Sequence, residues 1–218
     1  MKVAALKEVT YDPSVYLNVE TVGEAVSVIL TPEEGMSSEH RWKHEAPYLM
    51  TLIEKHCEPK SLVFDYGCGI GRLAKPLIEM LQCSVIGVDI SPAMRGLAAS
   101  LVDSHRFFAL PPEMLCWLEP SQCDFALAVW TLQHCLNLSM EVDRIRNALK
   151  KGGKLFVLNN EGRALPMNDG RWVDDGLDVR NVLTEKFRFE EIESGRIEDE
   201  SIAPNWLKKQ TFWAVYQK

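Results

Sequence analysis

Residues 62–74 of the chain read Leu-Val-Phe-Asp-Tyr-Gly-Cys-Gly-Ile-Gly-Arg-Leu-Ala. The stretch begins with a short apolar run, which suits a buried strand. Asp65 ends this run, glycines follow at positions 67, 69 and 71, and an apolar helical pattern continues to about residue 82. Glycines let the backbone adopt positive φ and approach a ligand closely, and the helix start offers free N–H groups. The stretch therefore predicts a strand, a ligand-binding turn and a helix.

The next segment repeats the pattern of a strand that ends in an acid. Residues 84–89 form an apolar run ending at Asp89, and Ile90-Ser91-Pro92 then opens a helix predicted over 93–102. An acid at the end of the second strand of such a unit can accept hydrogen bonds from both hydroxyls of a ribose. The two segments together predict a site for a nucleotide-like ligand.

Further alternation of strands and helices predicts an α/β sheet. Strands are expected at 106–109, 124–130, 154–159, 187–192 and 212–216, and helices at about 38–57, 114–118, 140–150 and 178–184. In the helix at 140–150, helical spacing places Val142, Ile145 and Leu149 on one face and Arg144 outside. Residues 15–30 fit either a helix or two short strands. Residues 162–177 are predicted to be a substrate loop, with a solvated connector as the alternative, and residues 194–208 a charged loop.

The residues 63–71 resemble motif I of the class I S-adenosylmethionine (SAM) dependent methyltransferases. Three later features occur in the order typical of that family: the acid at 89, the Asp124–His134 strand end and the Lys-Lys-Gly-Gly turn at 150–153. The resemblance implies a Rossmann-like, seven-stranded, mostly parallel sheet with helices on both faces and a C-terminal antiparallel strand. It implies one methyltransferase domain over 1–218, with a helical cap or lid at 1–57, a SAM-binding core at 58–160, and a substrate loop and terminal strands at 161–218.

The resemblance also implies roles for residues of the motif turns. The backbone of Gly67, Cys68 and Gly69 is expected to hold the methionine part of SAM. Asp65 is expected to orient this turn or to reach the amino group of SAM through water. By the same resemblance, Asp89 binds the ribose hydroxyls.

The remaining cofactor contacts come from four other segments. Ile90 is expected to pack on the adenine, and Val129 to lie beside the sulfonium. The family often has an acid after the third strand that binds the adenine amino group, but this chain has none until Glu113, so backbone groups of Ala109 or Leu110 are expected there. Arg41, with its neighbours at 40 and 42, is a candidate for the SAM carboxylate.

His134 is the best candidate for a general base, because histidine titrates near neutral pH. The alternative is a packing residue or one that starts a helix. The fourth strand does not end in the [Asp/Asn/Ser]-Pro-Pro-aromatic tetrapeptide of methyltransferases that act on planar amino nitrogens of bases or glutamine. This absence argues against that substrate class.

Composition limits the partners. The 218 residues carry a formal net charge of −7, which argues against a general nucleic-acid binder, and the six cysteines form no C-x-x-C pair. No run approaches ~20 apolar residues, so no membrane span is predicted and a cytoplasmic protein is expected. His40 and His44 are four residues apart, but zinc needs a third ligand, so no metal site is predicted.

The predicted activity is methyl transfer from SAM to an O, N or C atom of a small-molecule acceptor. Three alternatives stay open: a protein or RNA methyltransferase, a non-catalytic SAM-binding module, and a nicotinamide dehydrogenase on a similar fold. The sequence leaves the oligomeric state and the acceptor atom undetermined.

Overall fold

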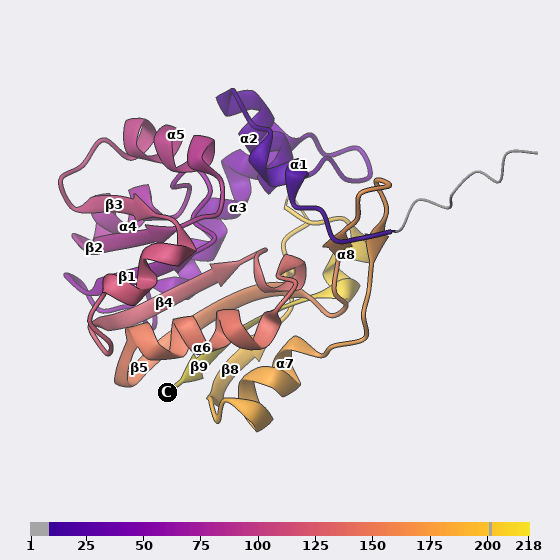
Figure 1. The fold of residues 1–218 in the computed structure, drawn as a ribbon. Helices are drawn as coiled ribbons and strands as arrows, with labels where there is room; N and C mark the ends of the chain where they lie inside the picture. Colours follow the sequence, from indigo (N-terminus) through magenta and orange to yellow (C-terminus); the bar gives the residue numbers. More distant parts are fainter. Residues whose placement is uncertain (1–8, 201) are drawn as a thin grey trace, which may run out of the picture.

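The computed structural model describes residues 9–200 and 202–218, so residues 1–8 of the predicted N-terminal segment lie outside the described residues. Seven strands form the central sheet: β1 (Leu62–Tyr66), β2 (Ser84–Val88), β3 (Phe107–Leu110), β4 (Cys123–Val129), β5 (Leu149–Asn160), β8 (Glu190–Gly195) and β9 (Thr211–Gln217). Their order is β3-β2-β1-β4-β5-β9-β8 (Figure 1). A two-stranded sheet joins β6 (Leu165–Pro166) to β7 (Trp172–Val173).

The pairing confirms the predicted sheet. Strands β1 to β5 are parallel, and β9 lies antiparallel between β5 and β8. The carboxyl ends of the parallel strands therefore share one edge, where the strand order reverses between β1 and β4. Open α/β sheets bind ligands at this switch point.

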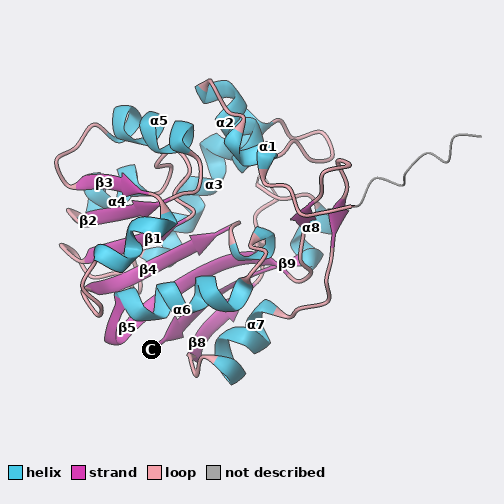
Figure 2. Ribbon diagram, in the orientation of Figure 1, coloured by secondary structure: helices cyan, strands magenta, loops and turns pink. Residues whose placement is uncertain are grey.

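Helices cover both faces of the sheet (Figure 2). The α-helices are α1 (Ser14–Leu17), α2 (Val22–Ile29), α3 (Ser38–Ile53), α4 (Ala74–Leu81), α5 (Pro92–Val102), α6 (Leu138–Ala148), α7 (Val179–Asn181) and α8 (Asn205–Gln210). Shorter helical turns are η1 (Pro112–Trp117), η2 (Leu132–His134) and η3 (Val182–Lys186), the last being a π-helix that continues α7.

Alternate residues of each strand supply two separate cores. Val63 of β1 packs in the core formed with α3, α4 and α5, whereas its neighbour Phe64 packs in the core formed with α6 and α7. Both side chains are fully buried, as are all four side chains from Phe125 to Ala128 in β4. Parallel strands covered on both faces have such continuous apolar runs, and full burial of each large side chain contributes about 1.5–3 kcal/mol.

The observed elements correct several predicted boundaries. Residues 15–30 contain two short helices, α1 and α2, separated by residues 18–21, and Thr21 with Glu24 forms a capping box at the start of α2. Strand β5 begins at Leu149, because this residue already pairs with Cys123 across an irregular register, so the Lys-Lys-Gly-Gly segment belongs to the strand and does not end the helix. The predicted strand at 187–192 lies instead at 190–195, where Glu190 pairs with Gln217.

The C-terminal half contains two elements that the sequence did not predict. Helix α8 begins in the predicted charged loop at 194–208 and continues to Gln210, and strands β6 and β7 form a hairpin within the predicted loop at 162–177. Among the described residues, no helix combines the length and apolar character needed to span a bilayer.

Candidate functional site

The glycine turn after β1 lies at the switch point of the sheet. Gly67 has φ of +80° and Gly69 of +53°, a region that favours glycine. The N–H groups of residues 67 and 68 donate to the Val88 carbonyl at 2.7 and 3.0 Å, so the turn is fixed to strand β2. A Cβ atom at Gly67 would lie 2.1 Å from Thr131 Oγ1, which leaves no room for a side chain.

Asp89 connects this turn to helix α5. Its Oδ2 accepts from the Gly69 N–H at 2.9 Å and its Oδ1 from the Ser91 N–H at 2.9 Å. Burial raises the pKa of Asp89, although these two hydrogen bonds act to lower it. A carboxylate has about four lone-pair sites, so each oxygen keeps capacity for one further donor. The two hydroxyls of a ribose match this remaining capacity, and the exposed side chain of Ile90 lies beside it.

The end of β4 forms the opposite wall. Trp130 follows Val129 and has φ of +57°, a left-handed conformation that is unusual for a bulky residue. Its indole Nε1 donates to Glu45 Oε1 of helix α3 at 2.8 Å. Glu45 is fully buried and also accepts from Arg72 at 2.9 Å and from Arg41 at 3.3 Å. Helix α3 thus holds the tryptophan side chain in place at the strand end.

A cavity of about 400 Å³ joins these parts. The cofactor side of its wall contains Val28, Ile29, Gly67, Gly69, Asp89, Ile90, Met94, Pro112, Glu113, Val129, Trp130 and Thr131. The other side contains Tyr11, Tyr16, Tyr66, His134, Cys135, Leu136, Asn137, Met140, Glu141 and Arg144. We call this second side the acceptor end. The cavity therefore extends from the glycine turn to residues of the N-terminal segment and helix α6.

His134 lies at the acceptor end with both ring nitrogens engaged. Its Nδ1 is 2.6 Å from the Ala164 carbonyl, so Nδ1 carries the proton. Its Nε2 is 3.0 Å from Gln133 Nε2, whose amide orientation is fixed because Gln133 Oε1 accepts from the Asn160 N–H. Burial lowers the pKa of His134 to about 4, while the Ala164 hydrogen bond opposes this. This geometry disfavours a general base, although that role stays a prediction.

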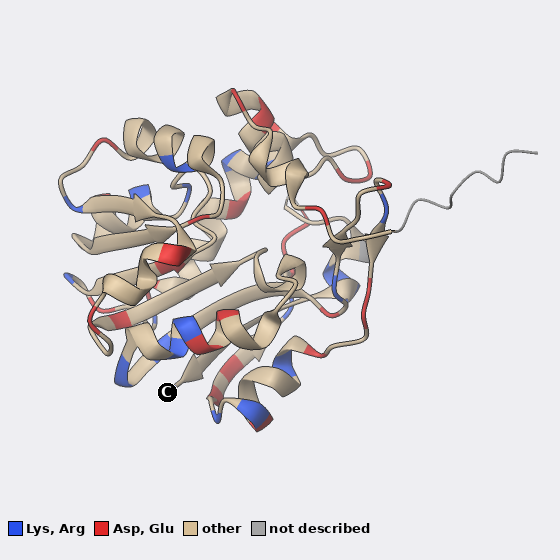
Figure 3. Cartoon of the chain, viewed as in Figure 1, with Lys and Arg blue, Asp and Glu red and all other residues tan. Residues whose placement is uncertain are grey.

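Glu141 and Arg144 form an ion pair at i and i+3 on helix α6, a helix on which Figure 3 shows acidic and basic positions next to each other. Glu141 Oε2 accepts from the Tyr66 hydroxyl and, at 2.7 Å, from Arg144 Nη1. Burial raises the pKa of the Tyr66 hydroxyl, and its bond to Glu141 adds to the effect. Helical spacing predicted Arg144 on the outer side of this helix. The structure corrects that prediction, because the Arg144 side chain lines the cavity and is only 27% exposed.

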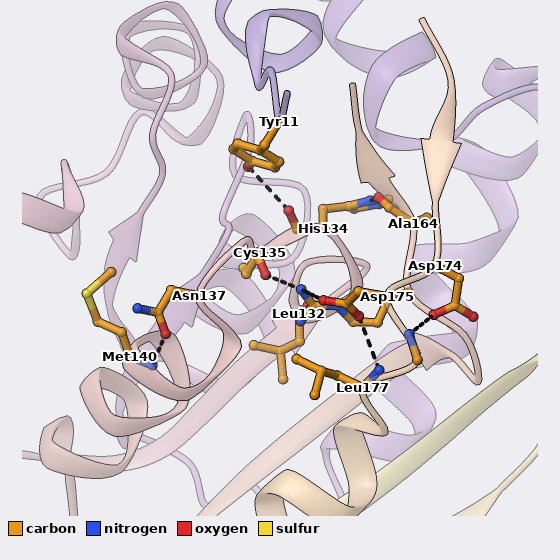
Figure 4. Close-up of polar contacts among 12 residues, drawn as sticks. Tyr11, Leu132, His134, Cys135, Asn137, Met140, Ala164, Asp174, Asp175 and Leu177 are labelled. Carbon is orange, nitrogen blue, oxygen red and sulfur yellow. Dashed lines mark hydrogen bonds and ion pairs between the residues drawn. The ribbon is translucent and has the colours of Figure 1, made fainter. Parts of the chain in front are cut away.

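Two segments from opposite ends of the chain close the acceptor end (Figure 4). Tyr11 pairs with Met167 in an isolated bridge, and its hydroxyl donates to the His134 carbonyl at 3.3 Å. Arg163 is buried and donates to the Cys135 carbonyl at 2.6 Å, and Asp175 contacts the same guanidinium at 3.3 Å. These contacts connect residues 9–17 and 162–177 to the turn that follows β4.

The structure brings six of the predicted residues to the cavity: Gly67, Gly69, Asp89, Ile90, Val129 and His134. The other five lie behind its wall. Asp65 and Cys68 are buried beneath the turn, and Leu110 packs in the core while its carbonyl accepts from the Asp89 N–H. Ala109 lies directly before Leu110 in β3. Pro112 and Glu113, which follow this strand, line the cavity in place of Ala109 and Leu110. Arg41 is occupied by Glu45 and the Thr31 carbonyl.

Sequence reasoning missed the three tyrosines, Glu45, and the Glu141–Arg144 pair. The sequence does contain a signal for the Glu141–Arg144 pair. The two residues are spaced at i and i+3 in the helix after β4, and that helix starts at the ligand-binding edge of the sheet. In the part of the chain that the structure describes, no group of three or more His, Cys, Asp or Glu side chains could hold a metal ion. His40 and His44 stack with ring centroids 4.3 Å apart.

Comparison with known proteins gives a consistent result. Residues 64–157 match the family model described as a methyltransferase domain. N-demethylindolmycin N-methyltransferase of Streptomyces griseus is 32% identical over 103 residues, which cover 44% of this chain and 43% of that protein. Phosphoethanolamine N-methyltransferase 2 of Caenorhabditis elegans is 26% identical over 104 residues, covering 46% of this chain and 24% of that protein. The chain thus spans less than half the length of either relative.

Solved structures share the fold at low sequence identity. The crystal structure of the [4+2]-cyclase SpnF superposes with a TM-score of 0.64 at 16% identity, covering 81% of this chain and 82% of that one. Other structures with this fold are complexes with S-adenosylmethionine or S-adenosylhomocysteine. Because a cyclase also uses the fold, the architecture alone does not define the reaction.

Proposed function

We propose that the chain is a SAM-dependent methyltransferase that transfers the methyl group of SAM to a small-molecule acceptor. The match of residues 64–157 to a methyltransferase domain supports this proposal, and so does the presence of S-adenosylmethionine or S-adenosylhomocysteine in structures that share the fold. One observation carries this proposal: a single cavity of about 400 Å³ contains both the glycine turn with Asp89 and the acceptor end. A cofactor bound at the turn and an acceptor bound among the tyrosines would meet beside Val129 and Trp130. That arrangement suits a direct transfer between two bound molecules.

The residues present fit the cofactor. Asp89 would hold the ribose through the free lone pairs of its two oxygens, and Ile90 would cover the adenine. Gly67 and Gly69, which have no side chains, would allow the methionine part to approach the backbone. The predicted contact of Arg41 with the SAM carboxylate is the least supported part, since Glu45 already neutralises that guanidinium.

Bound SAM supplies a methyl group that its positive sulfur already activates. The protein's main contribution is therefore alignment of the acceptor with this methyl group, and such orientation can supply roughly 7–11 kcal/mol of the barrier. Trp130 is suited to this task because Glu45 fixes its indole and its backbone conformation directs the ring to the cavity wall. Tyr11 and Tyr16 line the acceptor end, and the Tyr11 backbone connects it to the 162–177 loop.

We assign the three predicted parts of the domain accordingly. The core at 58–160 holds the cofactor, the N-terminal segment at 1–57 covers the cavity through its described residues, and the loop within 161–218 closes the acceptor end. A small acceptor fits the cavity volume better than a protein or RNA chain does. The names of the two relatives, both N-methyltransferases, support a small-molecule acceptor.

Isothermal titration tests the cofactor assignment. SAM and S-adenosylhomocysteine are expected to bind, whereas NADH is not. Asp89→Asn keeps the shape but loses the charge and an acceptor for one N–H, which should raise the Kd for SAM about 10- to 100-fold, from a loss of about 1.5–3 kcal/mol. The matched control is Asp103→Asn at the exposed end of α5, which should leave the Kd unchanged. Equal Kd values for both variants would contradict the ribose assignment.

A further inference from the structure

The charges on the cavity wall restrict the acceptor, an inference that rests on the proposed function. The described wall residues include three carboxylates, those of Asp89, Glu113 and Glu141, and one guanidinium, that of Arg144. Arg144 lies 2.7 Å from Glu141, so its charge is already neutralised. An acceptor with a phosphate or carboxylate group would enter a site of negative net charge without an available cation. The wall instead suits a neutral or positively charged acceptor.

Glu141 offers a free oxygen to such an acceptor. Both of its donors, the Tyr66 hydroxyl and Arg144 Nη1, reach Oε2. Within the described part of the chain, no hydrogen bond reaches Oε1, and the carboxyl group is 13% exposed at the cavity wall. A carboxylate oxygen with two free lone pairs binds an ammonium group well, because charge-assisted hydrogen bonds are the stronger kind. The Tyr66 and Arg144 contacts fix the orientation of this oxygen.

Aromatic side chains pack around His134 at the acceptor end. The Tyr16 ring lies 5.6 Å from the His134 ring, and the Trp172 ring lies 5.4 Å from His134 on the β6–β7 hairpin. The Tyr16 hydroxyl is buried and has no hydrogen-bond partner among the described residues, although the Tyr16 residue lines the cavity. Ring faces attract cations, and a hydroxyl can accept an N–H bond. Both features again favour an amine.

Among the described residues of the acceptor end, His134, Tyr11 and Cys135 are not available as a base for a hydroxyl acceptor. Both ring nitrogens of His134 are engaged, Nδ1 as a donor and Nε2 as an acceptor from Gln133. Burial raises the pKa of Tyr11 and of Cys135 to about 12, so both keep their protons at neutral pH. An alcohol must lose its proton as it attacks, whereas a neutral amine attacks through its own lone pair.

We propose that the acceptor is a small amine without phosphate or carboxylate groups, and that its nitrogen binds at Glu141 Oε1. The bound ammonium loses a proton through Glu141 to solvent. The nitrogen lone pair then forms the bond to the methyl carbon, and the electron pair of the carbon–sulfur bond stays on sulfur. The products are a methylated ammonium and S-adenosylhomocysteine, so charge and atoms balance.

A panel of matched acceptors tests this proposal. Tyramine, tryptamine and ethanolamine are each compared with the alcohol that replaces the amine, and two are compared with their phosphorylated forms, O-phosphotyramine and phosphoethanolamine. We expect at least one amine to release S-adenosylhomocysteine at least 10-fold faster than its alcohol and phosphate partners, with the methyl group on nitrogen by mass spectrometry. Faster turnover of an alcohol or phosphate would overturn the amine assignment but leave methyl transfer intact.

Two further outcomes separate the proposals. If SAM binds but no amine of the panel is methylated, the amine assignment fails while the cofactor assignment stands. If SAM does not bind at all in the titration above, the proposed function itself fails.

Variants of helix α6 give opposite expected effects. Glu141→Gln removes the charge and should raise KM for the amine at least 10-fold, with the Kd for SAM within twofold of the parent. Arg144→Gln frees Glu141 from its cation and should lower the amine KM. Asp143→Asn, an exposed change on the same helix, is the control and should alter neither value. If Glu141→Gln does not fold, Arg144→Gln still decides, because an unchanged or raised KM would contradict the assignment.

Discussion

Asp65 is predicted to make the protein less stable as pH rises, and an amide at this position should remove the effect. The carboxyl group is 3% exposed at the end of β1, beneath the glycine turn. Burial raises its pKa from 3.8 to about 7, Arg72 opposes this change, and Asp89 adds to it. The unfolded chain, which has no such burial, releases the proton near pH 4.

The magnitude follows from linkage between protonation and folding. Between pH 4 and 7 the unfolded state binds fewer protons than the folded state, so the free energy of unfolding falls as pH rises. The pKa of Asp65 differs between 3.8 in the unfolded chain and about 7 in the folded protein. This difference corresponds to about 4 kcal/mol of stability, all of which is lost above about pH 8. Asp65→Asn cannot ionise. It should therefore match the parent near pH 4 and exceed it by about 4 kcal/mol at pH 8.

Urea unfolding followed by tryptophan fluorescence at several pH values from 4 to 8 measures this difference directly. Asp124→Asn is the matched control, because the Lys150 ammonium at 2.6 Å and the Leu62 N–H hold the pKa of Asp124 below its ordinary value. Loss of the Asp124 carboxylate in this control should destabilise the protein at pH 8. An Asp65→Asn variant that is less stable than the parent at pH 8, or a difference that does not change with pH, would refute the argument.

Three further substitutions test other parts of the site. Gly67→Ala places a Cβ 2.1 Å from Thr131 Oγ1 at a φ of +80°, so we expect loss of SAM binding by titration calorimetry and a Tm well below that of Gly23→Ala, the control with open space; equal values would contradict the packing. His134→Gln should keep the shape of the pH–rate profile between pH 6 and 8, because His134 with its pKa of about 4 stays neutral there; loss of a limb of the profile would restore the role of general base. Glu45→Gln leaves two buried guanidinium groups without their counter-ion and should cost about 3–5 kcal/mol in urea unfolding; a cost below about 0.5 kcal/mol would show that the cluster is not a buried ion pair.

The sequence predicted the sheet well and identified several residues of the cavity wall, because both depend on local signals. Alternate glycines require positive φ, and an acid that ends a strand faces the ligand edge in any parallel sheet. Gly67, Gly69 and Asp89 therefore appear at the cavity without knowledge of distant contacts. The order of the motifs along the chain was sufficient to predict a mostly parallel sheet with an antiparallel C-terminal strand.

The acceptor end was not predictable in the same way, because it depends on segments distant in sequence. Tyr11 reaches the cavity only through its bridge to Met167, and no local pattern encodes that contact. Glu45 occurs in a polar part of α3 and becomes fully buried because Arg41, Arg72 and Trp130 converge on it. Helical periodicity placed Arg144 outside, since it cannot show where a helix passes the edge of a sheet.

The two segments that close the acceptor end could change in sequence during evolution while the sheet stays the same. Residues 9–17 and 162–177 lie outside the seven-stranded sheet and connect to each other through main-chain bonds, such as the Asp12 N–H to the Pro166 carbonyl at 2.9 Å. Side-chain exchanges in these two segments can reshape the pocket without disturbing the two apolar cores. Selection for a new acceptor would therefore meet little stability trade-off here, and libraries confined to these segments should retain folded, SAM-binding members.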